Sequence, residues 1–145
     1  MPTMHTYDYA VVRVVPRVER GEFVNVGVIV SCDAADSLAA RIELDPARVL
    51  ALDPGADIAA IGVALDAIGA VCAGSVAAGA LARLSPRERF HWLVAPRSAV
   101  IQTSPVHTGR SVTPAAVIDH LFETMVGLPQ RGAAPPQGPT DAGRT

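Results

Sequence analysis

The sequence predicts an α+β fold, in which an antiparallel sheet of about five strands carries two main helices on one face. Two valine-rich segments, residues 5–16 and 22–31, flank a short polar connection, which is the pattern of a β-hairpin. Residues 57–73 place apolar side chains three and four positions apart, as an amphipathic helix does. With 50% hydrophobic and 18% charged residues over 145 positions, the chain has the composition of one globular domain, which we expect over residues 1–127.

The first predicted strand, residues 5–16, is mostly apolar on both of its alternating faces, which suits a strand that is covered on both sides. Pro16 ends this strand because proline cannot donate a ladder hydrogen bond, and Gly21 is free to take a positive φ in the connection. The expected register has three pairs: Val15 with Phe23, Arg13 with Asn25, and Val11 with Gly27. One dry face then consists of five valines: Val12, Val14, Val24, Val26 and Val28.

Helix starts are indicated by Asp45-Pro46, by Asp57 and by Thr113-Pro114, since Asp caps a helix and Pro fits its first turn. The expected elements after the hairpin are a strand at 38–44, helices at 46–52 and 57–73, a helical turn at 80–84, strands at 90–96 and 99–103, a polar loop at 104–110, and a helix at 113–126. Residues 128–145 are dominated by Pro, Gly, Gln and Ala, so we expect a disordered C-terminal tail.

Composition excludes several classes of protein. The chain has no Lys, so a P-loop, a Schiff-base lysine and a kinase-type ATP-binding lysine are all impossible. A net charge of −2 without a basic run makes nucleic acid an unlikely partner. Cys32 and Cys72 lie far apart in apolar contexts, which is typical of buried reduced thiols. We find no signal peptide and no convincing membrane span, and therefore expect a cytoplasmic protein.

Arg13 is the first candidate for a functional residue, because a charge in an apolar strand needs a partner. One interpretation is structural: Glu22, Asp8 or a C-terminal carbonyl could hold the guanidinium. The other interpretation is a site for a phosphate or carboxylate group, in which Arg13, Arg17 and Arg20 are assisted by Asn25, since Arg binds such groups in a bidentate manner.

Glu22 and His107 are the best candidates for proton transfer or catalysis. Glu22 lies at the predicted turn, and His107 lies in a polar loop of the kind that often carries functional residues. A solvated carboxylate and a loop-anchoring histidine are the plainer alternatives. The predicted ligand-binding set is therefore Arg13, Arg20, Asn25 and His107. The spacing of His and Cys predicts no metal site, and no motif indicates a cofactor.

Several motifs resemble those of a bacterial family of unknown function, DUF3037. The residues that carry the resemblance are Tyr7-x-Tyr9-Ala10-Val11-x-Arg13-x-Val15-Pro16, Arg20-Gly21-Glu22-Phe23-x-Asn25-Val26-Gly27-Val28, Phe90-x-Trp92-Leu93, Ser98, and Ser104-Pro105-x-His107-Thr108-Gly109. The resemblance spans about residues 7–126 and excludes the tail. It carries over no catalytic residue, but it implies an accessory role, since relatives are often encoded beside a HipA-like kinase.

Two functions from different classes remain. We expect first a non-catalytic accessory or partner protein, with a HipA-like kinase as the candidate partner, because no complete catalytic set is visible. The alternative is a small enzyme or sensor that binds a phosphate- or carboxylate-bearing ligand through the Arg, Asn and His cluster. Whether the protein is an enzyme is left open by the sequence.

Overall fold

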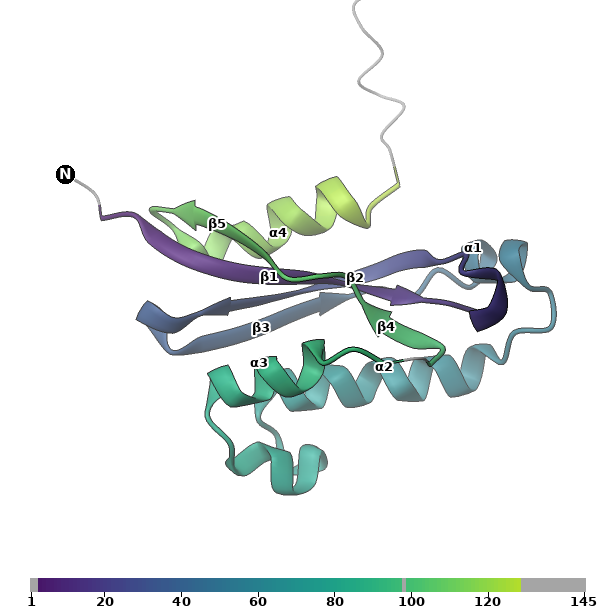
Figure 1. Ribbon diagram of the computed structural model, residues 1–145, viewed down its shortest axis with the longest axis horizontal. Coiled ribbons are helices and arrows are strands. Elements are labelled where there is room, and N and C mark those ends of the chain that lie inside the picture. The colour runs from purple at the N-terminus through teal and green to yellow at the C-terminus, as the bar shows by residue number, and fades with distance from the viewer. Residues whose placement is uncertain (1–2, 98, 129–145) are drawn as a thin grey trace, which may run out of the picture.

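The computed structural model describes residues 3–97 and 99–128, which form one antiparallel sheet with helices on both sides (Figure 1). The predicted disordered tail lies almost entirely outside the described residues. The sheet has five strands. Four of them follow the order β3-β2-β1-β4, and β5 also pairs with β1. The strands are β1 (His5–Val14), β2 (Val24–Cys32), β3 (Ser37–Ile42), β4 (Ile101–Thr103) and β5 (His107–Ser111). The predicted α+β class and five-stranded antiparallel sheet are confirmed.

A β-bulge interrupts the pairing of β1 with β2. The register shifts between Val12 and Arg13, whose partners in β2 are Gly27 and Asn25. Val26 is thus the extra residue on β2, and such an insertion bends the strand and increases its twist. The predicted pair of Arg13 with Asn25 is confirmed.

The bulge changes which valines share a face of the sheet. Val11 pairs with Val28 and not with Gly27, so the predicted pair is wrong by one position. Val24 and Val26 pack in the core beneath α2, whereas Val28 packs against α4 on the opposite face. The predicted face of five valines is therefore wrong at Val28, because one inserted residue exchanges the two faces of a strand.

Helices cover both faces of the sheet, with α4 (Pro114–Met125) on one side and α2 (Ile58–Ala73) and α3 (Pro86–Val94) on the other (Figure 1). The core beneath α2 and α3 contains Val12, Val14, Val24, Val26, Ile29, Val49, Ile61, Leu65, Val71, Cys72, Phe90 and Leu93. The core beneath α4 contains Val11, Val28, Val30, Val117, Leu121, Phe122 and Val126. The placement of both main helices on one face is wrong, because β1 is apolar on both sides and each side needs its own cover.

The predicted helix starts are confirmed for α1 (Pro46–Leu52) and α2. Asp45 accepts a hydrogen bond from the Ala47 amide, and Asp57 accepts one from the Ala60 amide. α4 also begins at the predicted Pro114. The helical turn expected at 80–84 is part of a 3₁₀ segment, η3 (Val76–Arg83). No single described helix is long and apolar enough to cross a membrane; α2 and η3 would reach that length together, but they are bent by 47°.

The strand predicted at residues 90–96 is wrong, because residues 90–94 belong to helix α3, which ends at Val94. Ser85 caps the helix by accepting a hydrogen bond from the Glu88 amide, and a proline follows at the first position. Phe90 and Leu93, three positions apart, are buried, whereas Trp92 is half exposed. The buried residues thus follow the helical period and not the alternation of a strand.

The polar loop predicted at residues 104–110 is also wrong, because most of it forms β5. The segment pairs with β1 from His5–Ser111 to Tyr9–His107. Gly109 permits this pairing, since a Cβ at this position would lie 2.4 Å from the Tyr7 ring. The sequence pattern of β5 is polar because this strand lies at the edge of the sheet, where little apolar surface is needed.

Ser104 lies between β4 and β5 and stabilises the break between these two strands. Its hydroxyl oxygen accepts a hydrogen bond from the Val11 amide at 2.9 Å, so the buried amide keeps a partner. Val15, predicted to pair with Phe23, lies beyond the last pair of β1 and β2 and donates instead to the Val100 carbonyl at 2.7 Å. One edge of β1 is therefore shared by two short strands.

We predict that Gly27→Ala destabilises the fold by about 1–3 kcal/mol, as overpacking does. The new Cβ would lie 2.7 Å from the Ile42 side chain and 2.8 Å from the Arg41 carbonyl oxygen, which the sheet holds in place. Urea unfolding measures the loss. Gly55→Ala is the control, because its Cβ meets only Asp53 at 3.5 Å, and a loss as large in the control would contradict the packing argument.

Candidate functional site

Arg13 on β1 points to the same face of the sheet as Val11, which packs beneath α4, and has no carboxylate partner within residues 3–97 and 99–128. Its guanidinium lies 4.0 Å from the centre of the Phe23 ring, which is a cation–π contact. Of the three partners that the sequence suggested, Glu22 pairs with Arg20 and Asp8 pairs with Arg87. Among the described residues, no ion pair is formed by Arg13. The charge is therefore held in place by stacking and is not neutralised.

Asn25 lies directly across the strand pair from Arg13 and connects β2 to the end of α4. Its side-chain amide donates a hydrogen bond to the Met125 carbonyl at 3.1 Å, which satisfies one of the free carbonyls at the helix end. Arg13 Nε and Asn25 Oδ1 are both buried and have no hydrogen-bond partner in the described part of the chain. One donor and one acceptor on neighbouring residues are thus unsatisfied, and both are shielded from solvent. We call Arg13, Phe23 and Asn25 the Arg13 cluster.

The other candidates at the hairpin tip are engaged with each other or with neighbouring elements. Arg20 Nε donates to Glu22 Oε1, and both side chains are exposed. Arg17 reaches across to Asp53, with 3.4 Å between nitrogen and oxygen. The Arg20–Glu22 pair is exposed on both sides and therefore contributes little to stability, whereas Arg17 meets a nearly buried Asp53.

His107 lies on β5, where it pairs with Tyr9 of β1 and is exposed. The two ring centres are 5.4 Å apart. Tyr9 and Arg13 are four residues apart on one strand, so His107 is displaced from Arg13 by roughly 13 Å along the sheet. The structure therefore brings Arg13 and Asn25 together but places His107 and Arg20 elsewhere.

A second polar cluster, which the sequence did not reveal as a unit, joins four elements. Arg87 of α3 pairs with Asp8 of β1 at 2.8 Å and donates to the hydroxyl of Ser31 on β2 at 3.1 Å. Thr108 of β5 donates to Asp8 at 2.6 Å. The Thr108 hydrogen bond and then the Arg87 guanidinium hold the pKa of Asp8 below its ordinary value, against the opposing effect of burial. Asp8 is thus a persistent anion that anchors α3 to the sheet.

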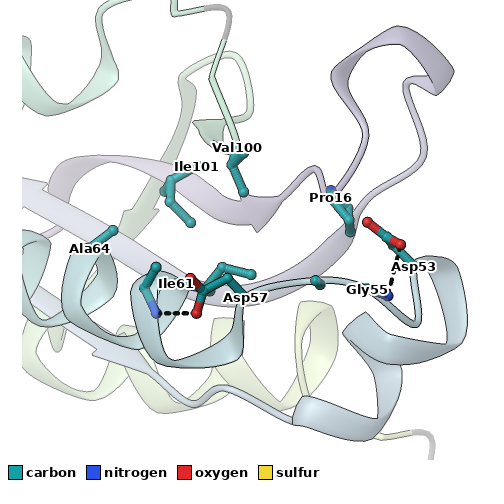
Figure 2. Close-up of a pocket in the computed structure, with 10 residues that line it drawn as sticks. Pro16, Asp53, Gly55, Asp57, Ile61, Ala64, Val100 and Ile101 are labelled. Atoms are coloured by element: carbon teal, nitrogen blue, oxygen red, sulfur yellow. Dashed lines mark hydrogen bonds between the residues drawn. The ribbon is translucent and has the colours of Figure 1, made fainter.

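Two pockets show what the surface offers to a small ligand. One pocket has a volume of about 280 Å³. Its apolar walls include Ile61 and Ile101, and Asp53 and Asp57 are among its lining residues (Figure 2). Both carboxylates already accept backbone hydrogen bonds, from the Gly55 amide and the Ala60 amide. A second pocket of about 310 Å³ lies over the Asp8–Arg87 pair. In both pockets the charged groups are engaged within the protein itself.

The predicted ligand-binding residues do not line the best-formed pockets. Five such pockets on the described part of the chain have volumes of 230–520 Å³, and none of the five is lined by Arg13, Arg20, Asn25 or His107. Within residues 3–97 and 99–128, no group of three or more His, Cys, Asp and Glu side chains could hold a metal ion. The Arg13 cluster is accordingly an open surface that can hold an anionic group but does not enclose one.

The fold and this surface define an α+β protein with a positively charged, partly aromatic cluster at the end of its central hairpin. A family model, described as Protein of unknown function (DUF3037), matches residues 9–126, and the chain belongs to this family. No curated protein and no solved structure is found to match the chain.

The Asp8–Arg87 cluster was missed for a physical reason. Asp8 lies on the same face of β1 as the apolar residues Ala10 and Val12. A charge on such a face needs a partner. The partner, Arg87, is distant in the sequence and lies just before a segment that the pattern predicts as a strand. Only the helical form of α3 aims Arg87 at the sheet.

We predict that Asp8→Asn destabilises the protein by about 1.5–3 kcal/mol at neutral pH, the range for hydrogen bonds to charged groups. Because the pKa of Asp8 is lowered on folding, its stabilising contribution is full above the ordinary value of 3.8 and is lost as pH falls through the folded-state pKa. Urea unfolding of both proteins should therefore show a difference that shrinks below pH 3.8.

Asp119→Asn is the matched control for this prediction. Asp119 also accepts from an arginine, Arg41, at 2.9 Å, but its side chain is 69% exposed and the pair is screened by water. An equal loss of stability in both variants at neutral pH would show that the contacts of Asp8 stabilise the fold no more than the exposed Asp119–Arg41 pair does.

Proposed function

We propose that this protein is a non-catalytic binding protein that docks an acidic segment of a partner protein on the Arg13 cluster. The observation that carries the proposal is the guanidinium of Arg13, which is stacked on Phe23 and has no carboxylate partner among the described residues. A charge that the fold itself leaves without a counter-ion is available for one supplied from outside.

The residue types of the Arg13 cluster fit a protein interface. Arg and aromatic residues are enriched among the residues that contribute most to binding energy. Phe23 is 45% exposed, so a partner can cover apolar surface and make an ionic contact at one place.

The shape of the surface favours a protein partner over a small ligand. Small-molecule sites are concave and bury most of their ligand. The Arg13 cluster lies outside the five pockets described above, and the remaining candidate, His107, lies further along the sheet. A partner segment needs no such enclosure, because it brings its own surface to the contact.

The partner's identity remains a prediction. The sequence resemblance favours a HipA-like kinase, and a cytoplasmic location would suit such a pair. The docking proposal requires only that the partner presents Asp or Glu beside an apolar side chain. It assigns no catalytic step to Glu22 or His107.

Affinity purification with quantitative mass spectrometry tests the proposal. Tagged wild-type protein should retain a specific partner, and Arg13→Gln and Phe23→Ala should each weaken that partner's binding by about 2 kcal/mol or more, as expected for residues at the centre of an interface. Arg13→Lys should bind at an intermediate level, because it keeps the charge but loses the planar stacking surface.

Arg83→Gln is the control, since Arg83 is an exposed arginine of η3 on a different part of the chain. A partner that is retained equally by all four variants would contradict docking at the Arg13 cluster. All variants must first show the wild-type melting temperature, so that loss of binding is not loss of fold.

The alternative function, a sensor or small enzyme for a phosphate- or carboxylate-bearing ligand, has one specific observation in its favour. Arg13 Nε and Asn25 Oδ1 are buried without hydrogen-bond partners in the described part of the chain, and one small polar ligand could satisfy both if neighbouring side chains moved aside to admit it. A thermal-shift screen with nucleotides and organic anions addresses it directly. A stabilising ligand whose effect disappears in Arg13→Ala would favour the sensor, and an effect unchanged in Arg13→Ala and His107→Ala would exclude this site.

A further inference from the structure

Strand β3 is an open edge of the sheet. Among the described residues it pairs only with β2, and its six residues contain no proline. The opposite edge is different, because Ser104 and Pro105 divide it into the two short strands β4 and β5. Natural sheets protect their edges with such interruptions, and β3 lacks this protection.

The hydrogen-bonding groups of β3 can be assigned to its two sides. The Glu43 amide donates to the Val26 carbonyl at 2.8 Å, so the odd-numbered residues face β2. In an antiparallel ladder alternate residues point their amide and carbonyl groups the opposite way. The outward groups therefore belong to Leu38, Ala40 and Ile42, within the span that pairs with β2.

This edge is complementary to itself. In an antiparallel pair centred on Ala40, Leu38 of one copy lies opposite Ile42 of the other, and each of the three outward-pointing residues meets another such residue. Leu38, Ala40 and Ile42 all belong to the apolar side that packs beneath α2. Arg41 lies opposite Ala39 and not opposite a second Arg41, so the register sets no like charges directly against each other.

Helix α2 has an open side next to the same edge. Its residues Asp57, Ala60 and Ala64 line the pocket that β4 closes, so this side faces β4. Gly62 and Gly69 lie on the other side of the helix by its period of 3.6 residues, and therefore face outward past β3. A Cβ built at either glycine would meet nothing within 4 Å. Asp66 lies further round the helix and is exposed, so it can stay hydrated.

We infer that β3 and the Gly62–Gly69 side of α2 form a two-fold interface with a second copy of this chain, which joins two five-stranded sheets edge to edge. The two features lie at one border of the molecule, and the glycines let two α2 helices approach while the strands pair. A second copy is the occupant that fits, because an isologous interface requires one surface to match itself. This inference is independent of the proposed docking at the Arg13 cluster.

The first experiment measures the mass in solution by light scattering coupled to size-exclusion chromatography. Wild-type protein should elute with twice the mass of one chain, and the double variant Gly62→Glu/Gly69→Glu should be a monomer. The variant should still fold, since each new side chain enters open space and Glu is a better helix former than Gly. Ala67→Glu, at an exposed position elsewhere on α2, should remain a dimer.

The second experiment tests the register by oxidative cross-linking with copper phenanthroline. In the inferred register, residue 40 faces its own copy with a Cα separation of about 5.5 Å, which suits a disulfide. Residue 39 faces residue 41, so its own copy is a diagonal neighbour about 7–8 Å away. Ala40→Cys should therefore cross-link efficiently and Ala39→Cys poorly. The native thiols are buried, and burial raises the pKa of Cys72 to about 12, so they do not interfere.

A wild-type protein that stays monomeric at high concentration would overturn the inference. A dimer that survives both glutamates, or that cross-links better through Ala39→Cys than through Ala40→Cys, would overturn it as well. A wild-type dimer, a monomeric double variant and preferential cross-linking at position 40 together would establish it.

Discussion

The structure depends on the central strand β1, which must be covered on both faces and paired on both edges. Its alternating valines enter two different cores, one beneath α2 and α3 and one beneath α4. Its edges pair with β2 on one side and with β4 and β5 on the other. A strand of this kind cannot keep an unsatisfied polar group cheaply, so each polar residue on it marks a place where another element or an outside partner is required.

The polar residues of β1 meet this requirement in different ways. Asp8 is satisfied within the protein by Thr108 and Arg87, and the cost of burying its charge is offset by hydrogen bonds from two elements. Arg13 is held over Phe23 and forms no ion pair with the residues that the structure describes. The same physical rule therefore indicates a structural role for Asp8 at one end of the strand, and it motivates the proposed binding role of Arg13 at the other end. The bulge at Val26 contributes to this difference, because it moves β2 by one position just where Asn25 faces Arg13.

The structure also separates two kinds of surface on one small sheet. The end of the hairpin carries charge and an exposed aromatic ring, which suits a polar contact with a different protein. The edge at β3 carries free backbone groups and small apolar residues, which suits a copy of the same chain. Because the two surfaces lie on different elements, a dimer through β3 would leave both Arg13 clusters available, and a partner could then be bound twice by one assembly.

Local rules predicted the α+β class, the β-hairpin, the Arg13–Asn25 pair, the capped starts of α1 and α2 and the proline at the start of α4, because a capping Asp, a proline and alternating valines act within a few residues. They failed at α3, where Phe90 and Trp92 imitate a strand, and at β5, where an edge strand needs no apolar pattern. Tertiary structure alone decided the bulge at Val26, the division of the helices between two faces, and the partners of Asp8 and Arg13. Those features arise from contacts between segments far apart in the chain, and no local sequence pattern predicts which distant side chain will lie beside a given residue.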